Sequence, residues 1–144
     1  MENERYEISL KLFLKNAAGK ILVLKPATWE PPFHKVHDFP GGRINVTEFA
    51  TPIYDILMRE VAEEIGTDAV GEISMTPVAT GRHMNKNGVP TFYLAFVAQY
   101  IEGAKITLSP DHNDILWLDL KNVKLEDYFM TGMLEIAQQY AVAL

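Results

Sequence analysis

The chain has 144 residues, of which 48% are hydrophobic, and its 19 acidic and 13 basic side chains give a formal net charge of −6. This length and composition fit a single globular domain over residues 1–144, and the negative charge argues against a nucleic-acid-binding protein. The absence of cysteine excludes disulfides, thiolate zinc sites and cysteine nucleophiles.

The N-terminal part of the chain predicts a β-hairpin that is followed by a loop. Residues 7–14 alternate polar and apolar side chains, and residues 20–24 form the expected returning strand after a turn at 16–19. Residues 26–35 hold three prolines and two aromatic residues, which indicates a loop. A short strand is expected at 36–39, directly before a Gly-Gly pair.

The segment 51–66 has the features of an amphipathic helix. Thr51 is a favourable N-cap, Pro52 suits the first helical position, and Gly66 is placed to end the helix. Apolar residues recur through the segment at helical spacing. We therefore expect one helix between the first group of strands and the second.

The rest of the chain predicts several strands and a closing helix. Strands are expected at 72–81, 91–101 and 115–120, with a weaker one near 104–108 and a polar turn at 110–114. A second helix is expected at 125–142. The order of strands, helix, strands and helix predicts an α+β fold in which helices pack on the faces of a mixed sheet.

The chain also bears on location and partners. The N-terminus is polar and does not resemble a signal peptide, and the longest apolar run, Phe92 to Ala98, is too short to span a membrane. We therefore expect a cytoplasmic protein with no membrane partner. The apolar C-terminal end at 141–144 can pack either on the core or on a second copy of the chain, which leaves a homodimer open.

Three carboxylates lie close together on the first predicted helix. Glu60, Glu63 and Glu64 are spaced i, i+3, i+4, so all three fall on one side of the helix. Their side continues a face that begins with apolar residues, which indicates the mouth of a cleft rather than an open surface. Clustered carboxylates repel one another unless a cation lies between them, and hard oxygen ligands suit Mg²⁺ or Mn²⁺.

These glutamates belong to a longer motif. Phe39-Pro-Gly-Gly-Arg-Ile-Asn-Val-Thr-Glu48, followed by Arg59-Glu-Val-Ala-Glu-Glu-Ile-Gly66, resembles the Nudix box. Gly42 and Glu48 match the first spacing of the box, and residues 59–66 match its second half. Ten residues rather than seven separate Glu48 from Arg59, and Thr67 stands where the box has an aliphatic residue.

The resemblance implies an α/β/α sandwich of the Nudix type and a specific chemistry. That chemistry is Mg²⁺-dependent hydrolysis of the pyrophosphate linkage in a nucleoside di- or triphosphate or a related nucleoside diphosphate derivative. The metal neutralises the phosphate charge and activates the attacking water. The implied protein is a hydrolase of phosphorus anhydrides whose partner is a small nucleotide.

The resemblance also implies roles for individual residues. The implied metal ligands are Glu60, Glu63, Glu64 and the backbone carbonyl of Gly41. Gly42 lets the backbone approach closely, and Arg59 orients the carboxylates through Glu63 or Glu48. The inserted residues leave the place of Glu48 open.

The general base is either a box glutamate, Glu63 or Glu64, or an acidic residue from a later loop. Asp111 and Asp114 are the loop candidates, and both also suit plain turn positions.

Candidate substrate-binding residues surround the motif. Phe33 and His37 precede the Gly-Gly pair and can stack on a base or contact a phosphate, while Arg43 and Arg82 can pair with phosphates. Loop packing and surface exposure are the alternative interpretations for these four residues. The sequence contains no marker that identifies the nucleotide.

Two other functions are compatible with the same fold. A catalytically silent nucleotide-binding module commonly loses box carboxylates, whereas all four glutamates are present here, which favours the enzyme. The Nudix isomerase that acts on isopentenyl diphosphate relies on a cysteine, and this chain contains none.

Overall fold

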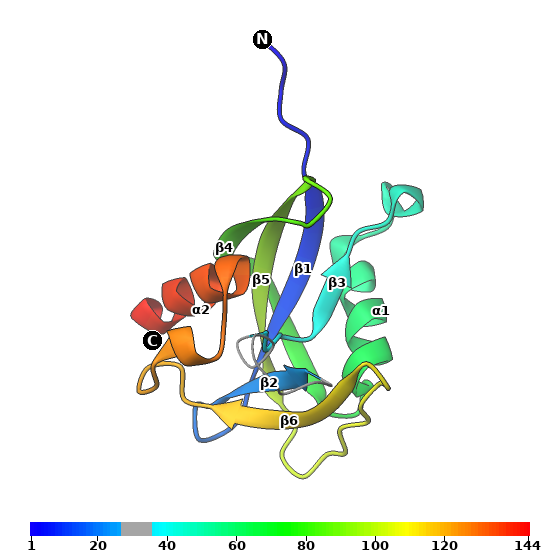
Figure 1. The fold of residues 1–144 in the computed structure, drawn as a ribbon. Helices are drawn as coiled ribbons and strands as arrows, with labels where there is room; N and C mark the ends of the chain where they lie inside the picture. Colours follow the sequence, from blue (N-terminus) through cyan, green and yellow to red (C-terminus); the bar gives the residue numbers. More distant parts are fainter. Residues whose placement is uncertain (27–35) are drawn as a thin grey trace.

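The alternating apolar segments form a six-stranded mixed sheet with one helix packed on each face (Figure 1). The structure, a computed structural model, describes residues 1–26 and 36–144. The strands are β1 (Glu7–Lys15), β2 (Ile21–Pro26), β3 (Gly41–Arg43), β4 (Val70–Met84), β5 (Pro90–Tyr100) and β6 (His112–Leu118), the helices are α1 (Ile53–Ile65) and α2 (Thr131–Ala143), and the 3₁₀ turns are η2 (Val46–Glu48) and η3 (Leu125–Asp127). The predicted mixed sheet with packed helices is confirmed.

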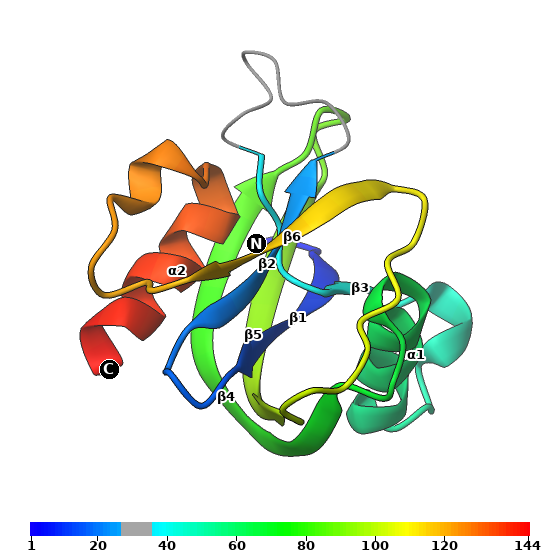
Figure 2. The same ribbon diagram turned by 90° about the horizontal axis from the view of Figure 1, so that it is seen from below.

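Strand β1 is the centre of the sheet. The strand order is β4-β5-β1-β2-β6, and the short β3 pairs with β1 (Figure 2). β1 runs parallel to β5, with Leu10 opposite Leu94, and antiparallel to β3, with Leu10 opposite Gly42. β1 therefore carries the Gly-Gly segment directly at its side.

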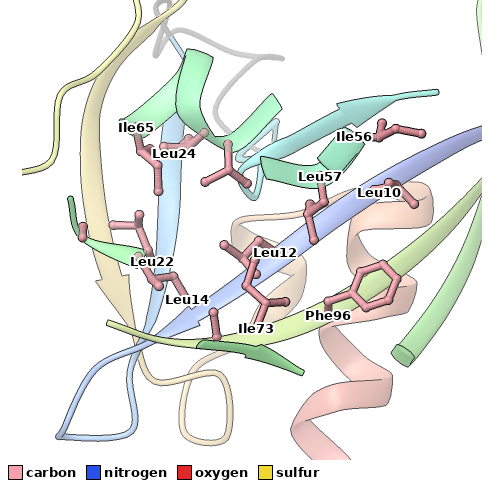
Figure 3. Packing of buried hydrophobic residues seen from close by; sticks show 13 residues of the cluster. Leu10, Leu12, Leu14, Leu22, Leu24, Ile56, Leu57, Ile65, Ile73 and Phe96 are labelled. Carbon is pink, nitrogen blue, oxygen red and sulfur yellow. The ribbon is translucent and has the colours of Figure 1, made fainter. Parts of the chain in front are cut away.

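Side chains of β1 alternate between two hydrophobic cores, as expected for a strand with period two. Leu10, Leu12 and Leu14 are fully buried beneath α1 and contact its apolar face (Figure 3). Ile56 and Leu57 supply that face of the helix. The same helix carries the glutamates, so burial of its apolar side sets where the carboxylates lie.

The second core lies beneath α2 and is rich in aromatic rings. Phe13 stacks on Tyr140 with ring centroids 4.6 Å apart and meets Phe39 edge-on at 4.8 Å. Phe39 also stacks on Phe129 at 4.9 Å. These contacts anchor Phe39 just before the Gly-Gly pair, so the second core helps to position that segment.

Helix α2 covers β4 at the edge of the sheet. The backbone N–H groups of Thr80 and Arg82 donate to the side chains of Gln139 and Glu135 at 2.6 and 2.7 Å. A Cβ atom at Gly81 would lie 2.9 Å from the carbonyl oxygen of Gly132. Close backbone approach and side-chain acceptors therefore protect an edge that would otherwise be open to pairing.

The strand expected at 36–39 is wrong, because that stretch makes only an isolated bridge. Asp38 exchanges two backbone hydrogen bonds with Leu24, and the regular strand begins later, at Gly41. The weaker strand expected near 104–108 is also wrong. Thr107 and Ser109 donate their N–H groups to the carbonyls of Ile65 and Glu64 at the end of α1, so this stretch closes the helix rather than pairing with a strand.

The closing helix expected at 125–142 is divided. The 3₁₀ turn η3 ends at Asp127, and α2 begins at Thr131, whose φ of 50° lies in the left-handed region. The intervening Tyr128 carbonyl accepts hydrogen bonds from the backbone N–H of His37, at 3.1 Å, and bonds the His37 ring at 3.2 Å. These long-range contacts are available only to a broken helix.

The predicted helix start is one residue early, because Pro52 itself is the N-cap and α1 begins at Ile53. Gly66 ends that helix as expected, with φ of 75°. At the C-terminus, Ala141 and Leu144 pack on the second core, while Val142 is 88% exposed. Within the described ranges, no helix has the length and apolar character needed to cross a lipid bilayer.

Candidate active site

Helix α1 presents its carboxylates to the Gly-Gly segment of β3. The backbone N–H of Gly41 donates to Glu64 Oε2 at 3.2 Å. A Cβ atom at Gly42 would overlap the carboxylate of Glu60. Two successive residues without side chains therefore let the backbone of β3 lie directly against two of the three predicted ligands.

Arg59 holds the carboxylates on its side of the helix. Its guanidinium bonds Glu48 through Nη2 at 2.8 Å and through Nε at 3.1 Å, and its Nη1 bonds Glu60 at 2.7 Å. A longer contact of 3.5 Å reaches Glu63. Arg59 thus contacts both of the partners that the sequence offered as alternatives, Glu48 and Glu63, and it contacts Glu60 as well. The hydrogen bonds with the carboxylates of Glu48 and Glu60 raise the pKa of Arg59.

The position of Glu48 follows from the turn that carries it. Glu48 ends η2, and its Oε1 accepts the backbone N–H of Asn45 at 2.9 Å. This hydrogen bond and the Arg59 guanidinium lower the pKa of the Glu48 carboxyl. The inserted residues lie between η2 and α1, so Glu48 still reaches Arg59 despite the longer spacing.

Glu64 lies in an acidic, partly buried environment. Burial raises the pKa of its carboxyl to about 7, and the negative charges of Asp38 and Glu60 act in the same direction. Lys11 and the Gly41 N–H oppose that shift. A negative charge on Glu64 is therefore costly in the protein alone, and a nearby cation would stabilise it.

A cavity of about 500 Å³ opens beside the segment that carries the Gly-Gly pair. Its lining residues come from β1, β2, the segment before β3, β4, β5, the turn before β6, the first residue of β6 and the start of α2. They are Lys11, Pro26, Val36, His37, Asp38, His83, Tyr93, Asp111, His112, Met130, Thr131 and Met133. Asp38 is three residues before Gly41. The cavity and the carboxylates are therefore linked by one short stretch of backbone, and the volume falls in the range of small-molecule sites.

The structure distributes the other predicted residues among several places. His37, which is 1% exposed, and Asp111 both line the cavity. Arg43 is exposed and pairs with Glu7 at 3.2 Å, while Arg82 lines a separate depression. Asp114 is exposed and lies in β6 opposite Lys25, and its carboxylate accepts the N–H of Ile115 at 2.7 Å. The polar turn expected at 110–114 is therefore wrong for its last three residues, which belong to the strand. Phe33 lies outside the described residues.

An ion pair at this cavity was not predicted from the sequence. Lys11 Nζ lies 2.9 Å from Asp38 Oδ1, and Lys11 is only 6% exposed. The signal for Lys11 was present, because it is a charged residue between Leu10 and Leu12 in a strand that is otherwise buried. Nothing in the local sequence identifies Asp38 as its partner, since 27 positions separate the two.

The donor set fits a hard divalent cation by its chemistry. Glu60 and Glu64 are half-buried carboxylates, and the glycines bring backbone close to both. Burial is the main cause of the raised pKa of Glu64, so a bound cation would stabilise its charged form. In the described residues, however, no three acidic or histidine side chains converge as a complete metal cluster. Glu60 and the exposed Glu63 turn toward Arg59 instead, so a shared metal would require new rotamers for them.

Comparison of the sequence with protein families gives one match. The family model described as NUDIX domain matches residues 6–140. No curated protein matches the sequence significantly. The matched range includes both helices almost entirely and every strand of the sheet.

Solved structures show the same fold at low sequence identity. The crystal structure of MutT protein from Methanosarcina mazei Go1 has a TM-score of 0.72 and 20% identity, covering 99% of this chain and 98% of that one. A C. elegans Ap4A hydrolase binary complex has a TM-score of 0.71 and 20% identity, with coverages of 95% and 96%. The NUDIX domain of Shewanella oneidensis NrtR, complexed with ADP ribose, has a TM-score of 0.68 and 16% identity, with coverages of 98% and 90%.

Proposed function

The chain belongs to the NUDIX domain family, and from this membership and the site geometry we propose that it is a Mg²⁺-dependent pyrophosphohydrolase acting on a nucleotide. Family membership makes it a hydrolase of phosphorus anhydrides. The nucleotide specificity and the metal requirement are the proposed parts. The substrate is a nucleoside di- or triphosphate or a related nucleoside diphosphate derivative.

The observation that carries this proposal is the contact between Glu64 and the Gly-Gly segment. The Gly41 N–H donates to Glu64. Because Gly42 has no side chain, the Glu60 carboxylate can occupy the space that a Cβ atom would take. Glu60 and Glu64, assisted by Glu63 and the Gly41 carbonyl, would hold Mg²⁺, with Mn²⁺ as a substitute. When bound, the metal would neutralise phosphate charge and favour hydroxide formation from water.

Other residues of the chain have supporting roles in this proposal. Arg59 keeps Glu60 and Glu48 in place through its fork of donors. The cavity beside Asp38 receives the nucleoside, and His37 forms part of its wall. We assign proton removal from the attacking water to Glu63, Glu64 or Asp111, since each is a carboxylate near the site. Arg43, Arg82 and Phe33 remain predicted phosphate or base contacts. We place the activity in the cytoplasm, where nucleotides are made and consumed.

The direct test is turnover of a nucleotide panel. We expect phosphate or pyrophosphate release from at least one nucleotide with Mg²⁺, and complete loss of release when EDTA is in excess. Mass spectrometry of products formed in ¹⁸O-labelled water would show which phosphorus is attacked. If nucleotides bind but none is cleaved with Mg²⁺ or Mn²⁺, the chain is instead a nucleotide-binding module.

Arg59→Lys should lower kcat by roughly tenfold, because lysine keeps the charge but loses the planar fork that bonds Glu48 and Glu60 together. The matched control is Arg5→Lys, which changes an exposed arginine near the N-terminus. Both variants should melt close to the parent protein. An Arg59→Lys enzyme with unchanged kcat would show that the guanidinium geometry has no part in catalysis.

A further inference from the structure

The cavity contains a charged pair that the proposed hydrolysis does not use. Lys11 Nζ donates to Asp38 Oδ1 at 2.9 Å and makes a longer contact of 3.5 Å with the Phe39 carbonyl. The same Oδ1 accepts the Phe39 N–H at 2.8 Å. In the described part of the chain, Asp38 Oδ2 accepts no hydrogen bond, although the residue lines the cavity.

The pair lies in a partly buried position, where removal of charged groups from water costs free energy. Lys11 is almost fully buried, whereas the Asp38 side chain is 34% exposed. Burial alone would lower the pKa of Lys11, but the ion pair with Asp38 more than offsets this, so the pKa is raised and the ammonium persists. The cavity therefore presents a fixed positive donor beside a fixed negative acceptor.

The rest of the cavity wall suits a flat, largely apolar ring system. Pro26, Val36, Met130 and Met133 supply apolar surface, and the Tyr93 ring adds an aromatic face. Tyr93 is held in place by α2, because a Cβ atom at Gly132 would overlap its ring. A heterocycle in this cavity would have polar atoms on more than one edge. The charged pair is available to one edge, and His83, Asp111 and His112 also line the wall.

The pair also lies at a suitable distance from the carboxylates. Asp38 is three residues before Gly41, whose N–H donates to Glu64, and three extended residues span about 10 Å at most. A nucleotide with its base at Asp38 would direct its phosphates toward α1. This step rests on the proposed function, because it assumes that the phosphates are attacked at Glu64.

We propose that Lys11 and Asp38 read the base of the nucleotide, and that they select a lactam edge, in which a carbonyl oxygen stands beside a ring N–H. The Lys11 ammonium donates to the carbonyl oxygen, and Asp38 Oδ2 accepts the ring N–H. In purines this is the edge of hypoxanthine and guanine. Lys11 and Asp38 are thus specificity-determining residues of the site.

The same edge of a 6-aminopurine, which has an amino group in place of the carbonyl oxygen, fits the pair less well. Adenine offers an amino group to the carboxylate but only a ring nitrogen to the ammonium. A carbonyl oxygen has two lone pairs and greater negative charge than a ring nitrogen, so a lysine favours it. The N–H next to a carbonyl is also more acidic than an amino N–H and is the stronger donor to a carboxylate.

Inosine and adenosine 5′-monophosphate differ only at this edge and provide the test. Isothermal titration of the whole protein, without Mg²⁺, should show inosine 5′-monophosphate binding at least about tenfold more tightly. Neither ligand contains a pyrophosphate, so the comparison stays valid even if the protein proves to hydrolyse nothing. Equal affinities, tighter binding of adenosine 5′-monophosphate, or no binding of either at millimolar concentration would overturn the proposal.

Asp38→Asn then tests the residue itself. The amide oxygen can keep the contacts with Lys11 and the Phe39 N–H, while the amide NH₂ replaces the free acceptor. We expect the preference for inosine 5′-monophosphate to disappear or reverse, whereas Asp68→Asn, at an exposed site, should retain it. A folded Asp38→Asn protein with the parent preference would refute the assignment. If this variant does not fold, the affinity ratio of the unmodified protein still decides the proposal.

Discussion

Replacing Glu64 with glutamine should lower kcat by roughly a hundredfold or more while leaving the fold intact. The change removes one negative charge from the proposed metal site, where electrostatic stabilisation of phosphate charge supplies most of the catalysis. Glutamine keeps the length of the side chain, and its amide oxygen can still accept the Gly41 N–H. Steady-state kinetics with Mg²⁺ on the nucleotide found in the panel would measure the loss.

Thermal unfolding separates this catalytic effect from a structural one. Burial raises the pKa of Glu64 to about 7, so at pH 8 its charge is carried at a cost to the folded state. The melting temperature of Glu64→Gln at pH 8 should therefore equal or exceed that of the parent. Glu72→Gln, at an exposed position of β4, is the matched control and should keep full activity. Near-normal turnover in a well-folded Glu64→Gln protein would refute the metal-site assignment.

Gly41→Ala should be the most damaging change to the fold among the glycines of the motif. Gly41 has φ of 146°, and a Cβ atom there would overlap the carbonyl oxygen of Leu10 in the neighbouring strand. The pairing of β3 with β1 would have to open, which costs roughly 3 kcal/mol and lowers Tm by roughly 10 °C. Turnover should fall as well, because the same residue donates its N–H to Glu64.

Gly88→Ala is the control that isolates backbone strain from the clash. Gly88 also has a positive φ, of 76°, but nothing lies within 4 Å of the position that a Cβ atom would take. Its substitution should cost only about 1 kcal/mol, or about 3 °C in Tm, with activity retained. Similar melting temperatures for the two alanine variants would show that β3 tolerates a side chain at Gly41.

Local signals in the sequence predicted the elements that depend on neighbouring residues. Alternation gave the β1 and β2 hairpin, and periodicity with Gly66 as terminator gave the extent of α1 to within one residue at its start. Helical spacing alone placed Glu60, Glu63 and Glu64 on one side. These predictions succeeded because hydrogen bonds and contacts between residues a few positions apart decide them.

The failures share the opposite cause, since each involves a partner far away in the chain. The Tyr128 carbonyl bonds His37, and the helix predicted at 125–142 is interrupted there, before Thr131. The carbonyls at the end of α1 bind residues 107 and 109, which keeps that stretch out of the sheet. Propensity within the segment contains no information about either partner.

The amino-acid sequence by itself determined the family motif, the carboxylate face of α1 and its pairing with Arg59, because these depend on spacing along one helix and a nearby turn. Only the tertiary structure decided that Glu60 and Glu64 are half buried against the glycines while Glu63 is exposed. It alone revealed the cavity with the Lys11 and Asp38 pair, which needs β1 and the segment before β3 to meet. Burial and long-range pairing depend on how the sheet assembles, and that arrangement follows from packing of the whole chain.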